Sequence, residues 1–182
     1  MNNKINSPDP AIAVIFSILG IMVPILFHML GLGSVFLPMF IPLAAGAFLM
    51  SPGYALLTGS MTPLFSAALT GMPPFYPPVA ILMMIELGAF CLIISLLKKK
   101  SRLNNITILA ISIIAERIIM VVLYYFVMPL FKINFGVISI YAITKSLPGI
   151  ILMLVIIPFF VPAASAVIEK RKLRLYEFSK EE

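Results

Sequence analysis

Ionisable side chains inside otherwise apolar stretches are the residues of this sequence best suited to chemistry. Glu86 lies within one long hydrophobic run, and Glu116 and Arg117 lie side by side in the middle of the next. Lys145 precedes the last run, and His28, which we interpret as an interfacial residue, comes near the end of the first. A charge inside a membrane span costs about 2.5–3.5 kcal/mol on insertion scales, so such residues usually face a partner or a cavity. They are therefore candidates for a binding site or a proton relay.

The composition shows what must surround these residues. Of the 182 residues, 62% are hydrophobic and 11% are charged, whereas an ordinary soluble domain has about 45–50% apolar and about 25% charged residues. Such a chain has too little polar surface to cover a globule in water, so we predict an integral membrane protein. The single cysteine, Cys91, excludes an internal disulfide and a cysteine-rich metal site, and we expect it in the core or facing lipid.

Six hydrophobic stretches approach the length of about 17–25 helical residues that a bilayer crossing requires. The second is short and contains Pro38 and Pro42, so we expect it to be kinked or to stop short of the far side. The first is interpreted as a retained span, because the polar start of the chain lacks the order of a signal peptide. The sequence thus predicts an all-α bundle of six transmembrane helices in a single membrane domain, residues 1–182, with a tail at 169–182. The spans are expected at 11–30, 35–50, 53–70, 79–97, 106–128 and 147–168.

The distribution of lysine and arginine predicts the orientation, because cytoplasmic ends of membrane proteins carry the basic excess. With the N-terminus inside, ten basic residues fall on the cytoplasmic side, and only Lys132 and Lys145 lie at or beyond the opposite face. We therefore expect both termini in the cytoplasm. The net charge of +6 follows from this topology and gives no reason to expect nucleic acid binding. The ten are Lys4, Lys98, Lys99, Lys100, Arg102, Lys170, Arg171, Lys172, Arg174 and Lys180.

The intramembrane charges allow more than one role. Successive helix residues point about 100° apart, so Glu116 and Arg117 are expected to face different ways, with Tyr124 on the side of Arg117. Glu86 and Arg117 could pair and fix helix packing, line a substrate pocket open to the outside, or belong to a proton relay. Lys145 is either an interfacial anchor with its amine directed outward or a contact for a ligand.

Two further stretches have possible functions. The connection at 71–78 holds four prolines, which make it extended and stiff. Phe75 and Tyr76 at its tip are either interfacial anchors or a lid over a pocket. In the first stretch, Ala13 and Ser17 are small residues four apart, a spacing that lets another helix approach closely.

Motifs for catalysis are missing from the sequence. It contains no G-x-x-x-x-G-K-[ST] phosphate loop, no H-E-x-x-H metal motif and no G-x-S-x-G nucleophile elbow. A single histidine leaves few general bases. We expect neither an enzyme nor a resident cofactor or metal.

Seven short motifs are spread in order along almost the whole chain. They are LPMFIP at 37–42, SPGY at 51–54, GSMTPL at 59–64, TGMPP at 70–74, MIEL at 84–87, AER at 115–117 and LPGII at 147–151. Their order and spacing resemble the substrate-binding S component of an energy-coupling factor (ECF) vitamin transporter. The likeness is to the broad group that includes pantothenate, folate and hydroxymethylpyrimidine binders.

The resemblance implies a six-helix fold with both termini in the cytoplasm, in the plasma membrane of a prokaryote. It also implies a substrate held near the outer surface by Glu86, Arg117 and Lys145, with Phe75 and Tyr76 closing the pocket. The partners would be a transmembrane coupling subunit and two cytoplasmic ATPases, to which ATP hydrolysis would belong.

The same resemblance implies a docking surface for the coupling subunit. Members often carry Ala-x-x-x-Ala in the first helix, and here Ala13 and Ser17 occupy these positions, with the second alanine replaced.

Three functions follow from these expectations. The first is a high-affinity subunit that captures a vitamin or related small molecule for an ATP-driven importer. The second is a stand-alone proton-coupled carrier that uses Glu86 and Glu116, and the third is a membrane scaffold without a small-molecule ligand. Both signs of charge occur in the candidate pocket, so charge alone does not select the substrate. If Glu116 faced a helix interface, the remaining excess would be basic, and a carboxylate-bearing vitamin would be favoured.

Overall fold

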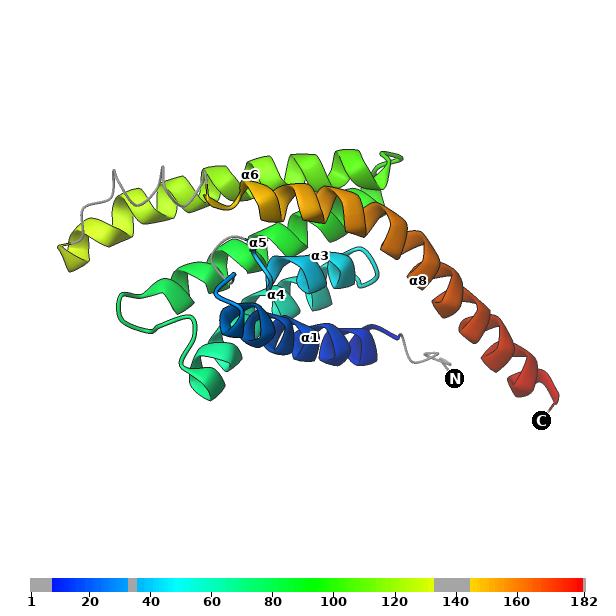
Figure 1. The fold of residues 1–182 in the computed structure, drawn as a ribbon. Helices are drawn as coiled ribbons and strands as arrows, with labels where there is room; N and C mark the ends of the chain where they lie inside the picture. The colour runs from blue at the N-terminus through cyan, green and yellow to red at the C-terminus, as the bar shows by residue number, and fades with distance from the viewer. Residues whose placement is uncertain (1–7, 33–35, 133–144, 182) are drawn as a thin grey trace.

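The computed structural model describes residues 8–32, 36–132 and 145–181, with side chains described up to residue 170. Within these ranges the chain forms six α-helices and one 3-10 helix and contains no strand (Figure 1). The expected all-α fold is confirmed. The helices are α1 (Asp9–Met29), α3 (Phe40–Ala47), α4 (Pro52–Thr70), α5 (Val79–Lys100), α6 (Asn105–Val127) and α8 (Leu147–Glu181), and the 3-10 helix is η1 (Met128–Phe131).

Four helical segments are long and apolar enough to cross a membrane, namely Asp9–Met29, Val79–Lys100, Asn105–Phe131 and Leu147–Lys170. They match the first, fourth, fifth and sixth expected spans. The helix α4 begins and ends within one residue of the third expected span but is not among these four candidates.

The second expected span, 35–50, is not confirmed as a crossing. Its helix α3 has only 8 residues, which reach about 12 Å at 1.5 Å per residue. Pro38 lies in a turn that precedes the helix, and Pro42 stands near its start, where a missing N–H removes no helical hydrogen bond. Residue 35 lies outside the described part of the chain.

The helix ends follow from local sequence signals. The side chain of Asn104 accepts a hydrogen bond of 2.7 Å from the backbone N–H of Thr107 and so caps the start of α6. Pro52 occupies the first turn of α4, and Gly71 ends that helix in the left-handed conformation at φ 74°, which glycine adopts without steric cost.

Glycines bring α4 and α5 into close contact. A Cβ atom on Gly59 would collide with the backbone oxygen of Leu87, and one on Gly88 would collide with the hydroxyl of Ser60. Small residues at both positions therefore let the two backbones approach, as is common between membrane helices. Cys91 is fully buried beside this contact, with its sulfur 3.7 Å from the carbonyl oxygen of Leu43. Of its two expected places, the core and the lipid-facing surface, it therefore occupies the core.

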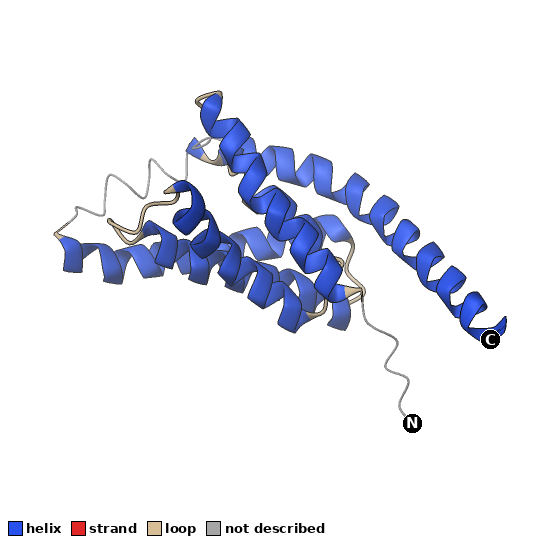
Figure 2. Cartoon of the chain, turned by 90° about the horizontal axis from the view of Figure 1, so that it is seen from below, coloured by secondary structure: helices blue, strands red, loops and turns tan. Residues whose placement is uncertain are grey.

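One end of the bundle is closed by polar contacts between helices, and we call it the closed end. The backbone N–H of Ser51 donates to a carboxylate oxygen of Asp9 at 3.3 Å, and the hydroxyl of Ser95 donates to the carbonyl of Met50 at 2.7 Å. The start of α1, the connection from α5 to α6 and the end of α8 all lie toward this side in Figure 1. The expected tail from residue 169 continues α8 as one helix that leaves the bundle (Figure 2).

Candidate substrate-binding site

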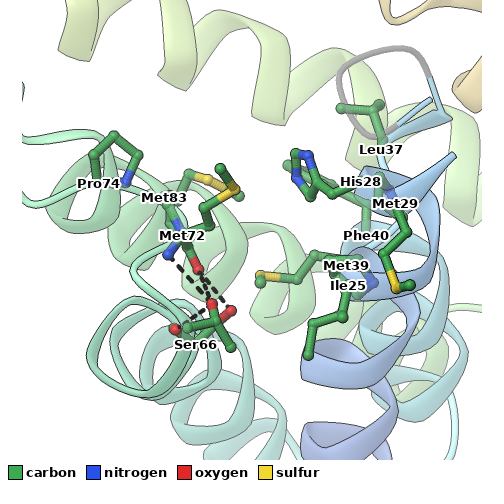
Figure 3. Close-up of a pocket in the computed structure, with 14 residues that line it drawn as sticks. Ile25, His28, Met29, Leu37, Met39, Phe40, Ser66, Met72, Pro74 and Met83 are labelled. Atoms are coloured by element: carbon green, nitrogen blue, oxygen red, sulfur yellow. Dashed lines mark hydrogen bonds between the residues drawn. The ribbon is translucent and has the colours of Figure 1, made fainter. Parts of the chain in front are cut away.

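Two adjoining cavities lie at the end of the bundle opposite the closed end. The larger, of about 700 Å³, lies between the end of α1, the turn before α3, the end of α4 and the start of the 71–78 connection (Figure 3). The smaller, of about 250 Å³, lies between α5, α6 and the start of α8. Leu37, Phe40 and Met83 line both. We call them the apolar cavity and the charged cavity after the side chains that line them.

The charged cavity brings together residues that are far apart in the sequence. Four of the six expected substrate-binding residues line it: Glu86 from α5, Arg117 and Tyr124 from α6, and Lys145 beside the start of α8. Glu116 lines it as well. The periodicity of α6 accounts for part of this set, because Arg117 and Tyr124 are seven residues apart and share one side of a helix.

Arg117 pairs with its neighbour rather than with Glu86. Its Nε atom lies 2.9 Å from Oε2 of Glu116 in an ion pair, and Nη1 lies 3.5 Å from the sulfur of Met120. The centre of its guanidinium stands 6.0 Å from the centroid of the Phe40 ring, a distance at which a cation is attracted to the ring face. The expectation that Glu116 and Arg117 would face different ways is wrong at the level of the side chains, because the long arginine side chain reaches back to the adjacent carboxylate.

Two carboxylate oxygens in the charged cavity have no hydrogen-bond partner among the described residues. They are Oε1 of Glu86 and Oε1 of Glu116, and the two residues are only 4% and 1% exposed. A buried polar atom without a partner is costly, and native proteins leave few of them. The charged cavity therefore offers hydrogen-bond acceptors that a bound molecule can satisfy.

The comparisons with known proteins now add to this geometry. A family model described as "ECF transporter, substrate-specific component" matches residues 10–168 of the 182-residue chain. The chain belongs to this family. Searches of the curated proteins and of the solved structures gave no match.

Family membership decides the class of activity. The chain is a substrate-specific subunit of a membrane transporter and not an enzyme. Such subunits associate in general with a membrane coupling subunit and ATPases. Its apolar helices agree with a multi-pass membrane protein.

The 71–78 connection of this S component contributes to the apolar cavity through its start, not its tip. Met72, Pro73 and Pro74 line the cavity, and the hydroxyl of Ser66 holds the turn by donating to the Met72 carbonyl at 2.7 Å. Phe75 and Tyr76 line neither cavity and are 52% and 75% exposed. The Tyr76 ring lies 6.0 Å from that of Phe131 in an edge-to-face contact, so the structure does not bring the two expected lid residues to the site.

The two expected docking residues of the S component face partly inward. Ala13 is half-buried and packs against the hydrophobic core. The hydroxyls of Ser17 and Thr62 lie 3.1 Å apart in a hydrogen bond between α1 and α4. Part of this small-residue side of α1 is therefore used for contacts within the chain.

Sequence reasoning missed the apolar cavity. Its walls carry the methionines 29, 39, 72 and 83, and His28, which was assigned to the membrane interface, lines it as well. One feature of the sequence does indicate a cavity here, namely the 37–42 stretch that is interrupted by prolines. Interrupted backbone at membrane depth is tolerated where it lines a cavity or is covered by protein. Phe40, at the end of that break, lines both cavities.

Proposed function

We propose that this S component captures a vitamin or a related small molecule with high affinity in the charged cavity and delivers it to an ATP-driven coupling module. The observation that supports this most is the convergence of Glu86, Glu116, Arg117, Tyr124 and Lys145 on one cavity, in a chain of a substrate-specific transporter family. Charged groups within membrane helices mark substrate pathways.

The cavities would open toward the outside of a prokaryotic plasma membrane, with both termini in the cytoplasm and residues 1–182 acting as one membrane domain. Lys98, Lys99 and Lys100 are exposed at the end of α5 that lies on the closed side, and the basic excess favours the cytoplasmic side. Glu86 and Met83, near the start of the same helix, line the cavities. This arrangement supports cavities that open away from the cytoplasm.

The proposed roles follow from the donors and acceptors in the site. Arg117 and Lys145 would donate to oxygen or nitrogen atoms of the substrate, Glu86 would accept from it, and Tyr124 would do either. Phe75 and Tyr76 line neither cavity in this structure, so they would close the site only if the 71–78 connection moved toward it. The sequence likeness supports a substrate of the broad pantothenate, folate and hydroxymethylpyrimidine group.

Uptake by cells tests this function. Cells that express the chain with or without the coupling subunit and two ATPases are given a panel of labelled water-soluble vitamins. The proposal expects accumulation of one compound only when the coupling module is present. Uptake by the chain alone that an uncoupler abolishes would instead support the proton-coupled carrier, for which Glu86 and Glu116 are suitably buried in one cavity.

Docking of the coupling subunit is proposed at Ala13 and Ser17. Ala13 is the sharper position to test, because Ser17 is also engaged with Thr62 inside the chain. Ala13→Phe should abolish coupled uptake and leave ligand binding unchanged, since a large ring would block close helix approach. Loss of ligand binding in this variant would argue that Ala13 serves internal packing instead.

A further inference from the structure

We infer that the two cavities form one bipartite site for a single molecule that has a hydrogen-bond-donating, cationic end and an aromatic or apolar body. The donating end would lie against Glu86 and Glu116 in the charged cavity, and the body would lie in the apolar cavity. This inference rests on the proposed function and names the substrate class of that site. Two independent observations lead to it.

The first observation is the balance of donors and acceptors in the charged cavity. Arg117 is already paired with Glu116, and Lys145 is not free. Among the described residues, three buried side-chain atoms here have no hydrogen-bond partner: Oε1 of Glu86, Oε1 of Glu116 and Nε of Arg117. Nε of Arg117 is in the ion pair with Glu116, so the two atoms left for a ligand are acceptors. A ligand that donates to both removes the cost of leaving them buried and unpartnered. A carboxylate-bearing substrate would be favoured if Glu116 faced a helix interface and left a basic excess in the pocket. Glu116 instead lines the cavity, so that preference does not apply.

The second observation is the adjacency of the cavities and the chemistry of the larger one. The side chains of Phe40 and Met83 line both, so the two cavities adjoin at these residues. In Figure 3 the side chains of Met39, Met72 and Met83 surround the apolar cavity. Thioethers adapt to irregular shapes and make favourable contacts with aromatic rings. The apolar cavity of about 700 Å³ is by itself in the size range of about 300–1,000 Å³ that holds small molecules.

Matched probes test the inference on the purified chain in lipid nanodiscs. Phenylbutylamine has both proposed features, phenylbutyrate replaces the donating end with an acid, and butylamine lacks the ring. Calorimetric titration, corrected with empty nanodiscs, should show phenylbutylamine binding at least about tenfold more tightly than either control compound. Equal affinity for the acid, or no binding of phenylbutylamine, would overturn the inference.

Variants separate the two halves of the site. Glu86→Gln should weaken phenylbutylamine binding about tenfold or more. Ile25→Trp and Met72→Trp should each lower the affinity for phenylbutylamine to that for butylamine. The reason is that Ile25 and Met72 line the apolar cavity and are partly exposed, so a large ring there would fill the cavity. Ile18→Trp is the matched control, since Ile18 lies two turns earlier on α1 and is exposed. If both cavity variants bound phenylbutylamine as tightly as the wild type, the ligand would occupy only the charged cavity, and the bipartite site would be wrong.

A lipid acyl chain is the competing occupant of the apolar cavity. If mass spectrometry of wild-type nanodiscs finds a retained lipid that Ile25→Trp releases and phenylbutylamine does not displace, the bipartite site is wrong. Failure of the proposed function gives a different result, because uptake independent of the coupling module would leave the probe comparison and the variant effects intact.

Discussion

Helix α5 packs against both α4 and α6, and these two contacts differ in kind. Toward α4 it is closely packed, with Gly88 and Gly59 placed where any side chain would collide with the facing helix. Toward α6 it lines a cavity of about 250 Å³ with the buried carboxylate of Glu86, whose Oε1 has no partner among the described residues. The first interface is typical of helix association in lipid. The second keeps a costly buried carboxylate oxygen that no described residue satisfies, which is typical of a functional site. One helix therefore combines a structural face with a binding face.

The largest expected effect is on the structural face. Gly59→Val should prevent α4 and α5 from approaching, because the added carbons would meet the backbone of Leu87. Overpacking of this kind costs about 1–3 kcal/mol or more. The measurement is the yield of monodisperse protein and its thermal unfolding midpoint. Gly53→Val is the control, since a Cβ atom on Gly53 has nothing within 4 Å, and an equal loss in both variants would refute the packing argument.

Arg117→Ala should give the largest effect on the binding face. It removes the ion-pair partner that holds the Glu116 carboxylate in the charged cavity. Substrate affinity is expected to weaken about 100-fold, or roughly 2–3 kcal/mol. The protein should still insert and fold. Arg102→Ala, at an exposed position between α5 and α6, is the control for loss of one positive charge. Unchanged affinity in Arg117→Ala would remove this residue from the site.

Glu86→Gln should separate the two faces most clearly. The substitution replaces a buried carboxyl group, whose Oε1 has no partner among the described residues, with an amide that cannot ionise, so thermal stability should stay the same or rise. Substrate affinity should fall about tenfold. These opposite directions are read from unfolding and binding measurements on the same preparation. A loss of stability with intact binding would mean that Glu86 supports packing instead.

The smallest expected effect is at the closed end of α5. Ser95→Ala removes the 2.7 Å hydrogen bond to the Met50 carbonyl and should lower the free energy of unfolding by about 1 kcal/mol. Substrate affinity should not change, because Ser95 lines neither cavity. Thermal unfolding and titration of the same sample check both parts. A matching loss of affinity would show that the closed end and the site are coupled.

The long helices and the charged cavity could be predicted from the sequence because their signals are local. Hydrophobic length defines α1, α5 and α6, and an arginine and a tyrosine seven residues apart share a helix side. The pairing of Arg117 with Glu116 could not be predicted, since it depends on a rotamer and not on helix phase. The short α3 was only partly foreseen from Pro38 and Pro42, because periodicity does not tell how far a broken span reaches.

The apolar cavity was beyond sequence reasoning for a different reason. It forms where the end of α1, the turn at Leu37 and the start of the 71–78 connection meet, and these segments are distant in the chain. Methionine in a membrane span is common and gives no sign of whether it faces lipid, core or cavity. Only the arrangement of helices distinguishes these environments.

Mass spectrometry of the small molecule released from detergent-purified protein tests the central claim most directly. Wild-type protein and the Gly53→Val control should carry one vitamin-like compound at near-equal stoichiometry, and Glu86→Gln and Arg117→Ala should carry much less of it. Retention of the same compound by all four proteins would show that the charged cavity is not the binding site. Absence of any compound from the wild-type protein would contradict high-affinity capture.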